Sequence, residues 1–322
     1  MSVKIRVICW LLLVVFSNSD VLAQNYPIKP VRLVSAFPPG GPTDILARPI
    51  GEKLMEAMGQ AFVIDFRTGA NGTLGSDYVV KSPADGYTLL VIPGSFTTSP
   101  STQKFLPYDA LRDFTGVSPL ARGQILLITN PKLQASNLRE LIAYAKANPG
   151  KLNYGSSGTG GSVHLGMELL NLIADIKMVH IPYKGAGPAL QDVIAGTADL
   201  MFIGATPAVP HIRTGKIRLI AAASSQRSLG FPDTPTIAEL GFPNFEIGSN
   251  YGIVAASATP RAIINRLNAA IEKALAHPDI KKFYIGTGVE PWWDTPENYS
   301  SWIREDVARW AAVAKAINYQ PE

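Results

Sequence analysis

Apolar runs of strand length alternate with helix-forming segments along most of this 322-residue chain, and this alternation restricts the possible fold more than any other feature. Examples of the apolar runs are "VRLVSAF", "AFVIDF", "YTLLVIPG" and "GQILLIT". A strand that is apolar along its whole length is covered on both faces, which is typical of parallel sheets. The alternation therefore predicts an α/β fold with parallel-type sheets and helices on both faces.

Sheets of this kind bind ligands where the carboxyl ends of strands meet the amino ends of helices, and three loops occupy that position. The first, "FPPGGPTD" at 37–44, has glycines that let the backbone approach a ligand, and Thr43 or Asp44 could cap the next helix. The second, "IPGSFTTS" at 92–99, is rich in hydroxyl groups. Taken alone, the first loop also fits a plain strand–helix turn and the second a polar surface loop.

The third loop lies within "NYGSSGTGGSVHLGMELL", residues 153–170, and has the composition of an anion-binding loop. From Gly155 it matches the phosphate-loop spacing G-x-x-x-x-G-K-[ST], except that Gly161 replaces the lysine. Its glycines free backbone N–H groups, and the helix predicted from Ser162 adds a partial positive charge. A triphosphate needs the missing lysine, whereas a single carboxylate fits neutral donors. The loop is therefore predicted to bind a carboxylate.

Two titratable side chains follow this loop on the same predicted helix. His164 and Glu168 are four residues apart, so they either fix the start of the helix or contact a ligand or metal, and we favour the structural role. The chain has no G-x-S-x-G motif, so a hydrolase would have to use a serine of residues 156–162 with His164. Lys184 in "PYKG" is either a ligand contact or a solvated lysine at the loop edge.

The N-terminal region predicts export. Lys4 and Arg6 precede the apolar run "VICWLLLVVF", and Val21 and Ala23 stand where signal peptidase requires small residues. Residues 1–23 are therefore expected to be a cleaved signal peptide, which predicts a periplasmic protein. The single cysteine of the chain lies inside this segment, so no disulfide, thiol nucleophile or lipidated N-terminal cysteine is expected after cleavage.

Charge patterning argues against a nucleic-acid partner. The net charge of +4 falls to +3 when the signal peptide removes two basic residues and one acidic residue. The basic residues form no run and are not interleaved with aromatic residues, as they are in nucleic-acid-binding segments. The motifs predict no cofactor and no metal site.

Several segments together resemble the Bug family, the extracytoplasmic solute receptors of tripartite tricarboxylate transporters. They are, in chain order, "FPPGGPTDILAR", "SPADGYTLL", "LPYDALRDF", "LIAYAKANPGKLNYGSSGTGGSVHL", "HIPYKGAGPALQDVIAGTADLMF", "TGKIRLIAAASSQRS", "FPDTPTIAELG" and "ARWAAVAKAI". Each segment alone is weak, but together and in the family's order they are specific. The sequence departs from the family at Thr68 and Asn71, where proline and glycine are usual, and at Asn250, where tryptophan is common.

The resemblance implies a two-lobed periplasmic binding protein fold, type II-like, that closes on its ligand. Lobe I would comprise residues 24–122 plus 250–322, and lobe II residues 123–249. The resemblance also implies a receptor without catalytic activity that delivers a small carboxylate to the membrane subunits of a tripartite tricarboxylate transporter, and we expect it to be a monomer. The alternatives are a receptor that signals without a dedicated permease and, least favoured, a periplasmic Ser/His hydrolase.

The loops and the resemblance together give one set of candidate ligand contacts. Members of the family hold ligands mainly with main-chain amides and ordered water from both lobes, which agrees with the analysis of the third loop. The candidate residues are Phe37, Pro39, Gly40, Gly41, Thr43, Ser95, Ser156, Ser157, Gly158, Thr159, Gly160, Ser162, Lys184 and Thr206.

Overall fold

The computed structural model describes residues 25–224, 227, 231–243 and 245–321, and the predicted signal peptide at 1–23 lies outside them. The strands are β1 (Val31–Ser35), β2 (Phe62–Phe66), β3 (Thr88–Ile92), β4 (Phe114–Thr129), β5 (Asn153–Ser156), β6 (Val179–Pro182), β7 (Leu200–Gly204), β8 (Arg218–Ala222), β9 (Gly248–Ala256) and β10 (Val289–Pro291). The helices are α2 (Pro42–Met58), α3 (Thr73–Val80), α4 (Ser95–Thr102), α5 (Leu138–Ala147), α6 (Ser162–Ile173), α7 (Ala186–Ala195), α8 (Ala205–Arg213), α9 (Arg261–Ala276), α10 (Pro278–Gly286) and α11 (Pro296–Ala316), with a 3₁₀ turn η1 (Ala70–Gly72). None of the helices in these described ranges is long and apolar enough to cross a membrane.

The strands form one hydrogen-bonded path in the order β2-β1-β3-β9-β4-β7-β5-β6, and β8 and β10 also pair with β4. The α/β class predicted from the alternation is confirmed. The prediction of parallel sheets holds for β1 with β2 and β3 and for β5 with β6 and β7. It is wrong for the pairs that include β4 or β9, which are antiparallel. β9 and β4 lie between the two groups of parallel strands and connect them, one strand leading out of the first group and the other leading back.

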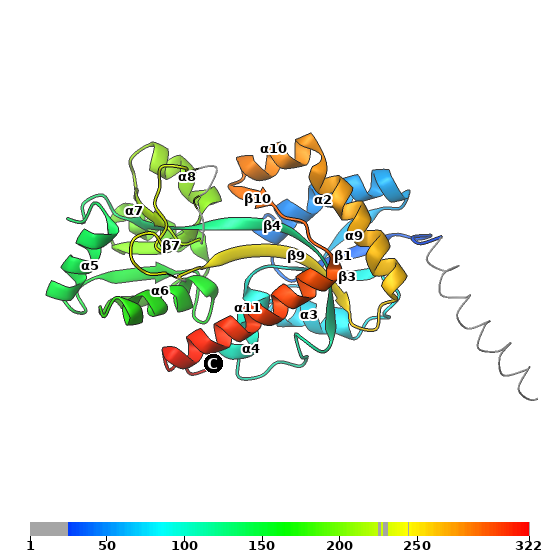
Figure 1. The fold of residues 1–322 in the computed structure, drawn as a ribbon, viewed down its shortest axis with the longest axis horizontal. Helices are drawn as coiled ribbons and strands as arrows, with labels where there is room; N and C mark the ends of the chain where they lie inside the picture. The colour runs from blue at the N-terminus through cyan, green and yellow to red at the C-terminus, as the bar shows by residue number, and fades with distance from the viewer. Residues whose placement is uncertain (1–24, 225–226, 228–230, 244, 322) are drawn as a thin grey trace, which may run out of the picture.

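The pairing of β4 changes partway along its length. Its first part pairs with β9 from Phe114 to Gln124, and its last part pairs with β7 from Ile125 to Thr129. Figure 1 shows the result as two groups of elements, with β1–β3, α2 and α9 on one side and β5–β8 with α5–α8 on the other, joined by β4 and β9. The predicted lobe boundaries stay a prediction, and this change of pairing supports them.

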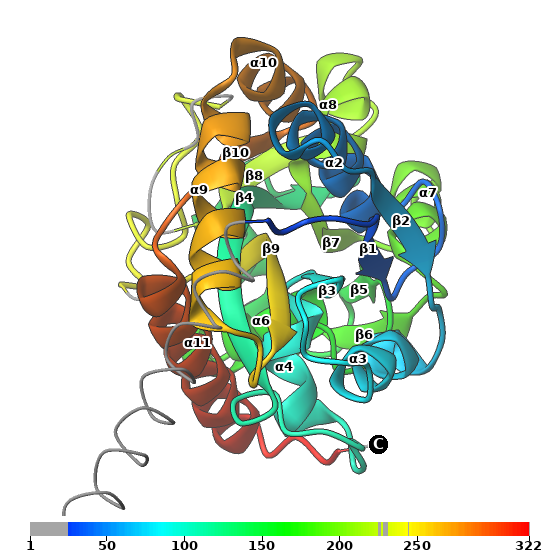
Figure 2. The ribbon, with the colours of Figure 1, turned by 90° about the vertical axis from the view of Figure 1, so that its right-hand side faces the viewer.

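Each group of strands has its own buried clusters of apolar side chains, on both faces of the sheet. Helix α11 joins the two groups from outside the sheet. Tyr299, Ile303 and Val307 pack into a cluster with β3 and α4, whereas Trp310, one turn further, packs into a cluster of the second group with α6. Figure 2 shows α11 and the C-terminus at the edge of the molecule, beside α4. The C-terminal helix therefore contacts both groups.

The segment predicted as a polar loop at 92–99 is in part a helix, because α4 starts at Ser95. Its hydroxyl groups donate to backbone carbonyls one turn back: Thr97 to Gly94 at 2.9 Å, Ser99 to Ser95 at 2.7 Å and Thr102 to Thr98 at 3.2 Å. Serine and threonine have modest helix propensity because they compete for such backbone groups. In α4 these side-chain bonds are compatible with the helix. The composition of the segment alone did not predict a helix here.

We predict that Gly252→Ala in β9 destabilises the protein. A Cβ there would overlap the phenol group of Tyr299 in α11. It would also lie 3.0 Å from the carbonyl oxygen of Ser118 in β4, the strand that pairs with β9. Overpacking of this kind costs about 1–3 kcal/mol, to be measured as the free energy of unfolding in denaturant. Gly286→Ala is the matched control, because nothing lies within 4 Å of the added atom. Equal stability of the two variants would contradict the prediction.

Candidate functional site

A cleft with a volume of about 720 Å³ lies between the two groups of strands. Its first wall consists of residues 37–38, 40–43, 45–46, Asn71, 93–95 and 287–289, and its second wall of residues 157–159, 161–163, 185–187 and 201–207. Residues 123–125 of β4 and Ser249 and Tyr251 of β9 line it between the walls. The volume is within the range of about 300–1,000 Å³ that is typical of ligand pockets.

Five helices begin at this cleft, and each has a glycine at its N-cap. The N-cap residues are Gly41 of α2, Gly94 of α4, Gly161 of α6, Gly185 of α7 and Gly204 of α8, and all five line the cleft. None of these helices has a side-chain hydrogen bond at its N-cap. The first N–H groups of a helix have no intrahelical acceptor, and its N-terminus has a partial positive charge. The cleft is therefore rich in backbone donors and favours an anion.

Among the residues that the structure describes, those lining the cleft include no aspartate, glutamate, lysine, arginine or histidine. Their polar side chains are hydroxyls and the amides of Asn71 and Gln124. An anion in this cleft would therefore meet neutral dipoles only. Such a set of donors suits one carboxylate better than the multiple charges of a polyphosphate, for which lysine, arginine or a metal ion is usual.

The first loop, residues 37–44, is held from behind by polar side chains. Asp44 is buried, accepts a hydrogen bond of 2.9 Å from the N–H of Gly40, and is bonded to Arg48. The hydroxyl of Thr43 lies 3.0 Å from that of Ser35. The expectation that Thr43 or Asp44 caps α2 is wrong, because Gly41 is the N-cap residue. Asp44 instead stabilises the turn that places Gly41 at the cleft.

The loop from Ser156 to Ser162 has the backbone conformation that the glycines predicted, with φ of +139° at Gly158 and +76° at Gly160. Two of its amides are used inside the protein. The N–H of Gly158 donates to Ser156 Oγ at 3.2 Å, and the N–H of Gly160 donates to Nδ1 of His164 at 3.1 Å. Thr159, Gly161 and Ser162 line the cleft, which makes their amides the candidate donors to a ligand.

Most of the candidate residues chosen from the sequence lie together at the cleft. Those that line it are Phe37, Gly40, Gly41, Thr43, Ser95, Ser157, Gly158, Thr159, Ser162 and Thr206. Pro39, Ser156, Gly160 and Lys184 are not among the lining residues. Ser156 is fully buried, Gly160 faces Thr102 and Tyr319 on the other side of the loop, and Pro39 and Lys184 are exposed. The role of each residue in binding stays a prediction.

Sequence reasoning missed the residues that the two crossover strands place in the cleft. Gln124 of β4 and Ser249 of β9 lie at the point where the strands leave one group for the other, and neither belongs to a glycine-rich motif. Asn71 was noted only as a departure from the family pattern. It has a φ of +50°, a conformation that asparagine tolerates better than most residues, and its side chain joins the lining of the first wall.

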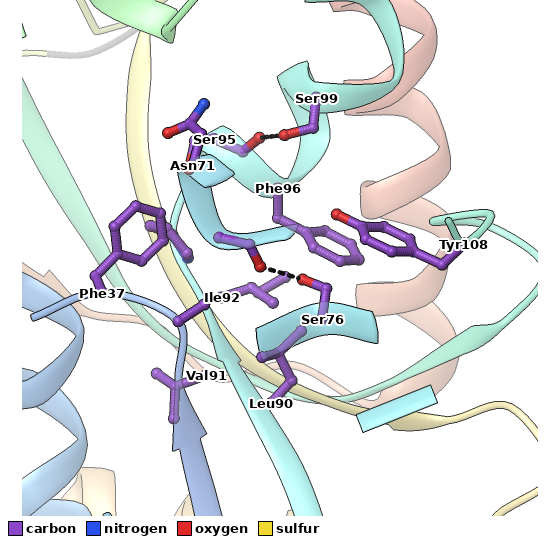
Figure 3. Close-up of a pocket in the computed structure, with 13 residues that line it drawn as sticks. Phe37, Asn71, Ser76, Leu90, Val91, Ile92, Ser95, Phe96, Ser99 and Tyr108 are labelled. Carbon is purple, nitrogen blue, oxygen red and sulfur yellow. Dashed lines mark hydrogen bonds between the residues drawn. The ribbon is translucent and has the colours of Figure 1, made fainter. Parts of the chain in front are cut away.

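A second, much smaller cavity adjoins the first wall. Its volume is about 10 Å³, and Phe37, Asn71 and Ser95 line both this cavity and the cleft. Figure 3 shows it between Phe37, Ser76, Phe96 and Tyr108, with the hydroxyl of Ser76 donating to a backbone oxygen. A cavity of this size holds about one water molecule. Of these two cavities, only the cleft has room for an organic ligand.

The histidines near the loop do not form a catalytic or metal site with the predicted partners. The described residues contain no group of three or more His, Cys, Asp or Glu side chains that could hold a metal ion. His164 accepts the amide of Gly160, and the serine that meets a histidine is Ser156, 2.7 Å from Nε2 of His180. Because Ser156 is fully buried and does not line the cleft, this pair does not reach a bound ligand.

Comparisons with known proteins agree with this architecture. A family model described as "Tripartite tricarboxylate transporter family receptor" matches residues 46–319. Protein BugT of Bordetella pertussis is 37% identical over 299 residues, which are 92% of this chain and 92% of that protein. An R. palustris protein solved with adipate has a TM-score of 0.83 and 34% identity, with 92% of this chain and 100% of that chain covered. MatC from Rhodopseudomonas palustris, solved with bound malate, has a TM-score of 0.78 and 31% identity, with 89% and 99% covered.

We predict that Gln124→Glu weakens anion binding strongly while the protein stays folded. Gln124 Oε1 accepts a hydrogen bond of 2.8 Å from Ser224, which a glutamate oxygen preserves, but the new charge would lie in a cleft without a compensating cation. Repulsion between two unit charges about 4 Å apart is worth about 4 kcal/mol at an effective dielectric constant of about 20. We therefore expect a loss of affinity of about 100-fold or more by calorimetry.

The matched control is Gln103→Glu, which makes the same change in charge outside the cleft. Gln103 also uses its Oε1 as an acceptor, for the hydroxyl of Thr73 at 2.8 Å. The affinity of the Gln103→Glu variant for the same ligand should be close to that of the unmodified protein. Equal losses in both variants would show that net charge, rather than the cleft, controls binding.

Proposed function

The chain belongs to the family of tripartite tricarboxylate transporter receptors, and we propose from this premise that it captures one small carboxylate in the cleft between its two groups of strands. The resemblance to the Bug family found in the sequence is thereby confirmed, and the family's members are solute-binding receptors. The proposal assigns the cleft as the ligand site and residues of both walls as its contacts. It treats the protein as a binding protein rather than an enzyme.

The observation that carries this proposal is the convergence of five glycine-capped helix N-termini on a cleft whose described lining residues include no acidic or basic side chain. Each helix N-terminus is equivalent to about half a positive charge. Two of the five helices, α2 and α4, belong to the first wall, and α6, α7 and α8 belong to the second. A carboxylate between the walls receives donors from both, which no single loop supplies.

The remaining lining favours a carboxylate with an apolar body. Large apolar side chains from both walls and from the crossover strands surround the donors. They are Phe37, Ile45, Leu46, Ile125, Met201, Phe202, Ile203, Tyr251 and Val289. Each added charge on a ligand would need further donors. Burial of methylene or aromatic groups, in contrast, removes apolar surface from water and so makes the free energy of binding more favourable. Aliphatic and aromatic mono- or dicarboxylates therefore fit better than tricarboxylates, and the relatives solved with adipate and malate are in keeping with a carboxylate ligand.

We further propose that the protein acts in the periplasm as a monomer and presents its ligand to the membrane subunits of a tripartite transporter. The family assignment supports this role, and the N-terminal sequence supports export. A receptor that signals without a dedicated permease would use the same cleft. This alternative differs only in the protein that the ligand-bound receptor contacts. Uptake of labelled ligand in cells with and without genes for the membrane subunits of tripartite tricarboxylate transporters separates these two roles.

A thermal-shift screen of the mature protein against carboxylates tests the ligand assignment. A ligand present at about 100 times its dissociation constant adds about 2.7 kcal/mol of stability. We expect aliphatic or aromatic dicarboxylates to raise the melting temperature, citrate to have a smaller effect, and the corresponding diamides to have none. Binding of an acid and its amide with equal affinity would refute the carboxylate assignment.

We also expect the protein to close when a ligand contacts both walls. A ligand that touches both walls has more contacts in the closed state than in the open state, and this difference shifts the population. Small-angle scattering should therefore show a smaller radius of gyration when a ligand from the screen is added. Identical scattering with and without ligand, combined with a bound structure in which only one wall touches the ligand, would contradict the two-wall site.

A further inference from the structure

A group of buried and half-buried aromatic and titratable side chains lies directly behind the loop at 157–162. The rings of His164 and His180 are stacked, with centroids 3.9 Å apart and planes at 21°. Tyr154 stacks on His180 at 5.0 Å, and its hydroxyl donates to Glu168. Tyr319, from the segment after α11, meets His164 edge-on at 6.0 Å. These side chains come from β5, β6, α6 and the C-terminal segment, and none of them lines the cleft.

The hydrogen bonds of this group assign the proton on His164. The backbone N–H of Gly160 donates to Nδ1 of His164 at 3.1 Å, so Nδ1 must be an acceptor and the ring proton belongs on Nε2. His164 is the third residue of α6, and its ring reaches back to the amide just before the N-cap. The glutamate of a capping box makes an equivalent bond to the N-cap amide. The ring therefore determines where the amide of Gly160 points.

The same accounting assigns the proton on His180. Ser156 Oγ lies 2.7 Å from Nε2 of His180, 3.0 Å from the carbonyl oxygen of Gly158 and 3.2 Å from the nitrogen of Gly158. A hydroxyl has one proton, and all three contacts are satisfied only if His180 donates from Nε2. Ser156 then donates to the carbonyl and accepts from the amide of Gly158. His164 thus holds the loop as a neutral ring, and His180 holds it through the proton on its Nε2.

The surroundings favour these neutral rings. Burial lowers the pKa of His164 to about 4. Burial, together with the neighbouring His164, lowers the pKa of His180 to about 4, while Glu168 opposes the shift. The groups that face the pair are Tyr154, Glu168 and Tyr319, and none of them is a cation. A proton on Nδ1 of His164 would oppose the N–H of Gly160 and break the bond.

We propose that His164, supported by His180, is a positioning residue for ligand binding: its neutral ring fixes the amide of Gly160 and thereby turns the amides of Thr159, Gly161 and Ser162 toward the cleft. Protonation of His164 in acid releases the loop, independently of the ionisation of the ligand. The proposal rests on the proposed function only in taking this loop as part of the ligand site. The proposal goes beyond the proposed function because the side chains that fix the loop do not line the cleft.

Amide hydrogen exchange of Gly160 in the ligand-free protein, followed by NMR, tests the proposal. His164→Leu removes the acceptor, and we expect about tenfold faster exchange or more at Gly160. His164→Asn places Oδ1 near the position of Nδ1 and should restore most of the protection. Met167→Ala, a change at a fully buried core position of the same helix, is the control for general loss of stability. It should leave the ratio of Gly160 exchange to that of β7 amides unchanged.

A pH titration of the unmodified protein gives a readout that a purely structural role would not move. The ring signals of His164 and His180 should stay in the neutral form down to about pH 4. Exchange at Gly160, corrected for its intrinsic rate, should increase only as the pH falls through about 4, where His164 gains a proton, and His164→Asn should lack this increase. Titration of His164 near pH 6.5, or unchanged protection of Gly160 in a folded His164→Leu variant, would overturn the proposal. No ligand is used, so the outcome does not depend on the proposed function.

Discussion

The antiparallel pairing of β4 with β9 is the interaction on which the rest of the structure depends, because these two strands carry the chain from one group of elements to the other. They also place Gln124 and Ser249 between the cleft walls. Helix α11 supports this connection from outside. Asp306 accepts a hydrogen bond of 2.6 Å from Thr97 of α4 and is bonded to Arg309, which donates at 2.6 Å to the carbonyl oxygen of Glu246, just before β9. A helix whose N-terminus faces the ligand is thereby linked to the segment that leads into a crossover strand.

The helices of this protein do not all begin in the same way. Asn137 of α5, His277 of α10 and Thr295 of α11 cap their helices with side-chain hydrogen bonds. The five helices at the cleft have glycine instead. Replacement of a capping side chain by glycine costs only a few tenths of a kcal/mol, whereas replacement by alanine costs about 1 kcal/mol. Glycine thus keeps the helices nearly as stable and leaves their first N–H groups for a ligand.

The parts of the structure that could be predicted from the sequence are those that local patterns determine. Apolar runs gave the strands, and the glycines at 158 and 160 indicated positive φ, as observed. The direction of β4 and β9 could not be predicted, because pairing between distant segments leaves no local pattern. For the same reason Gln124 was missed. Ser156 and Gly160 were expected at the ligand because glycine and hydroxyl groups mark a loop as an anion site without indicating which side of it faces the cleft. The two histidines that occupy the other side decide this, and they lie 16 residues apart in different elements.

A cleft built from neutral donors has a consequence for a protein that must release what it binds. A buried arginine or lysine would leave an uncompensated charge whenever the ligand departed, and an unpaired buried charge costs several kcal/mol. When the ligand leaves an open cleft, the cost in free energy is smaller for backbone N–H groups, because water replaces the ligand as their acceptor. The difference in free energy between the empty and filled states is therefore moderate, which favours exchange. Selectivity for an anion is retained, because the donors are fixed by the fold and cannot turn to present an acceptor to a neutral or cationic solute. The two glycine-rich loops show how this is achieved. Asp44 in the loop at 37–44, and His164 and His180 behind the loop at 157–162, make their hydrogen bonds on sides that face away from the cleft.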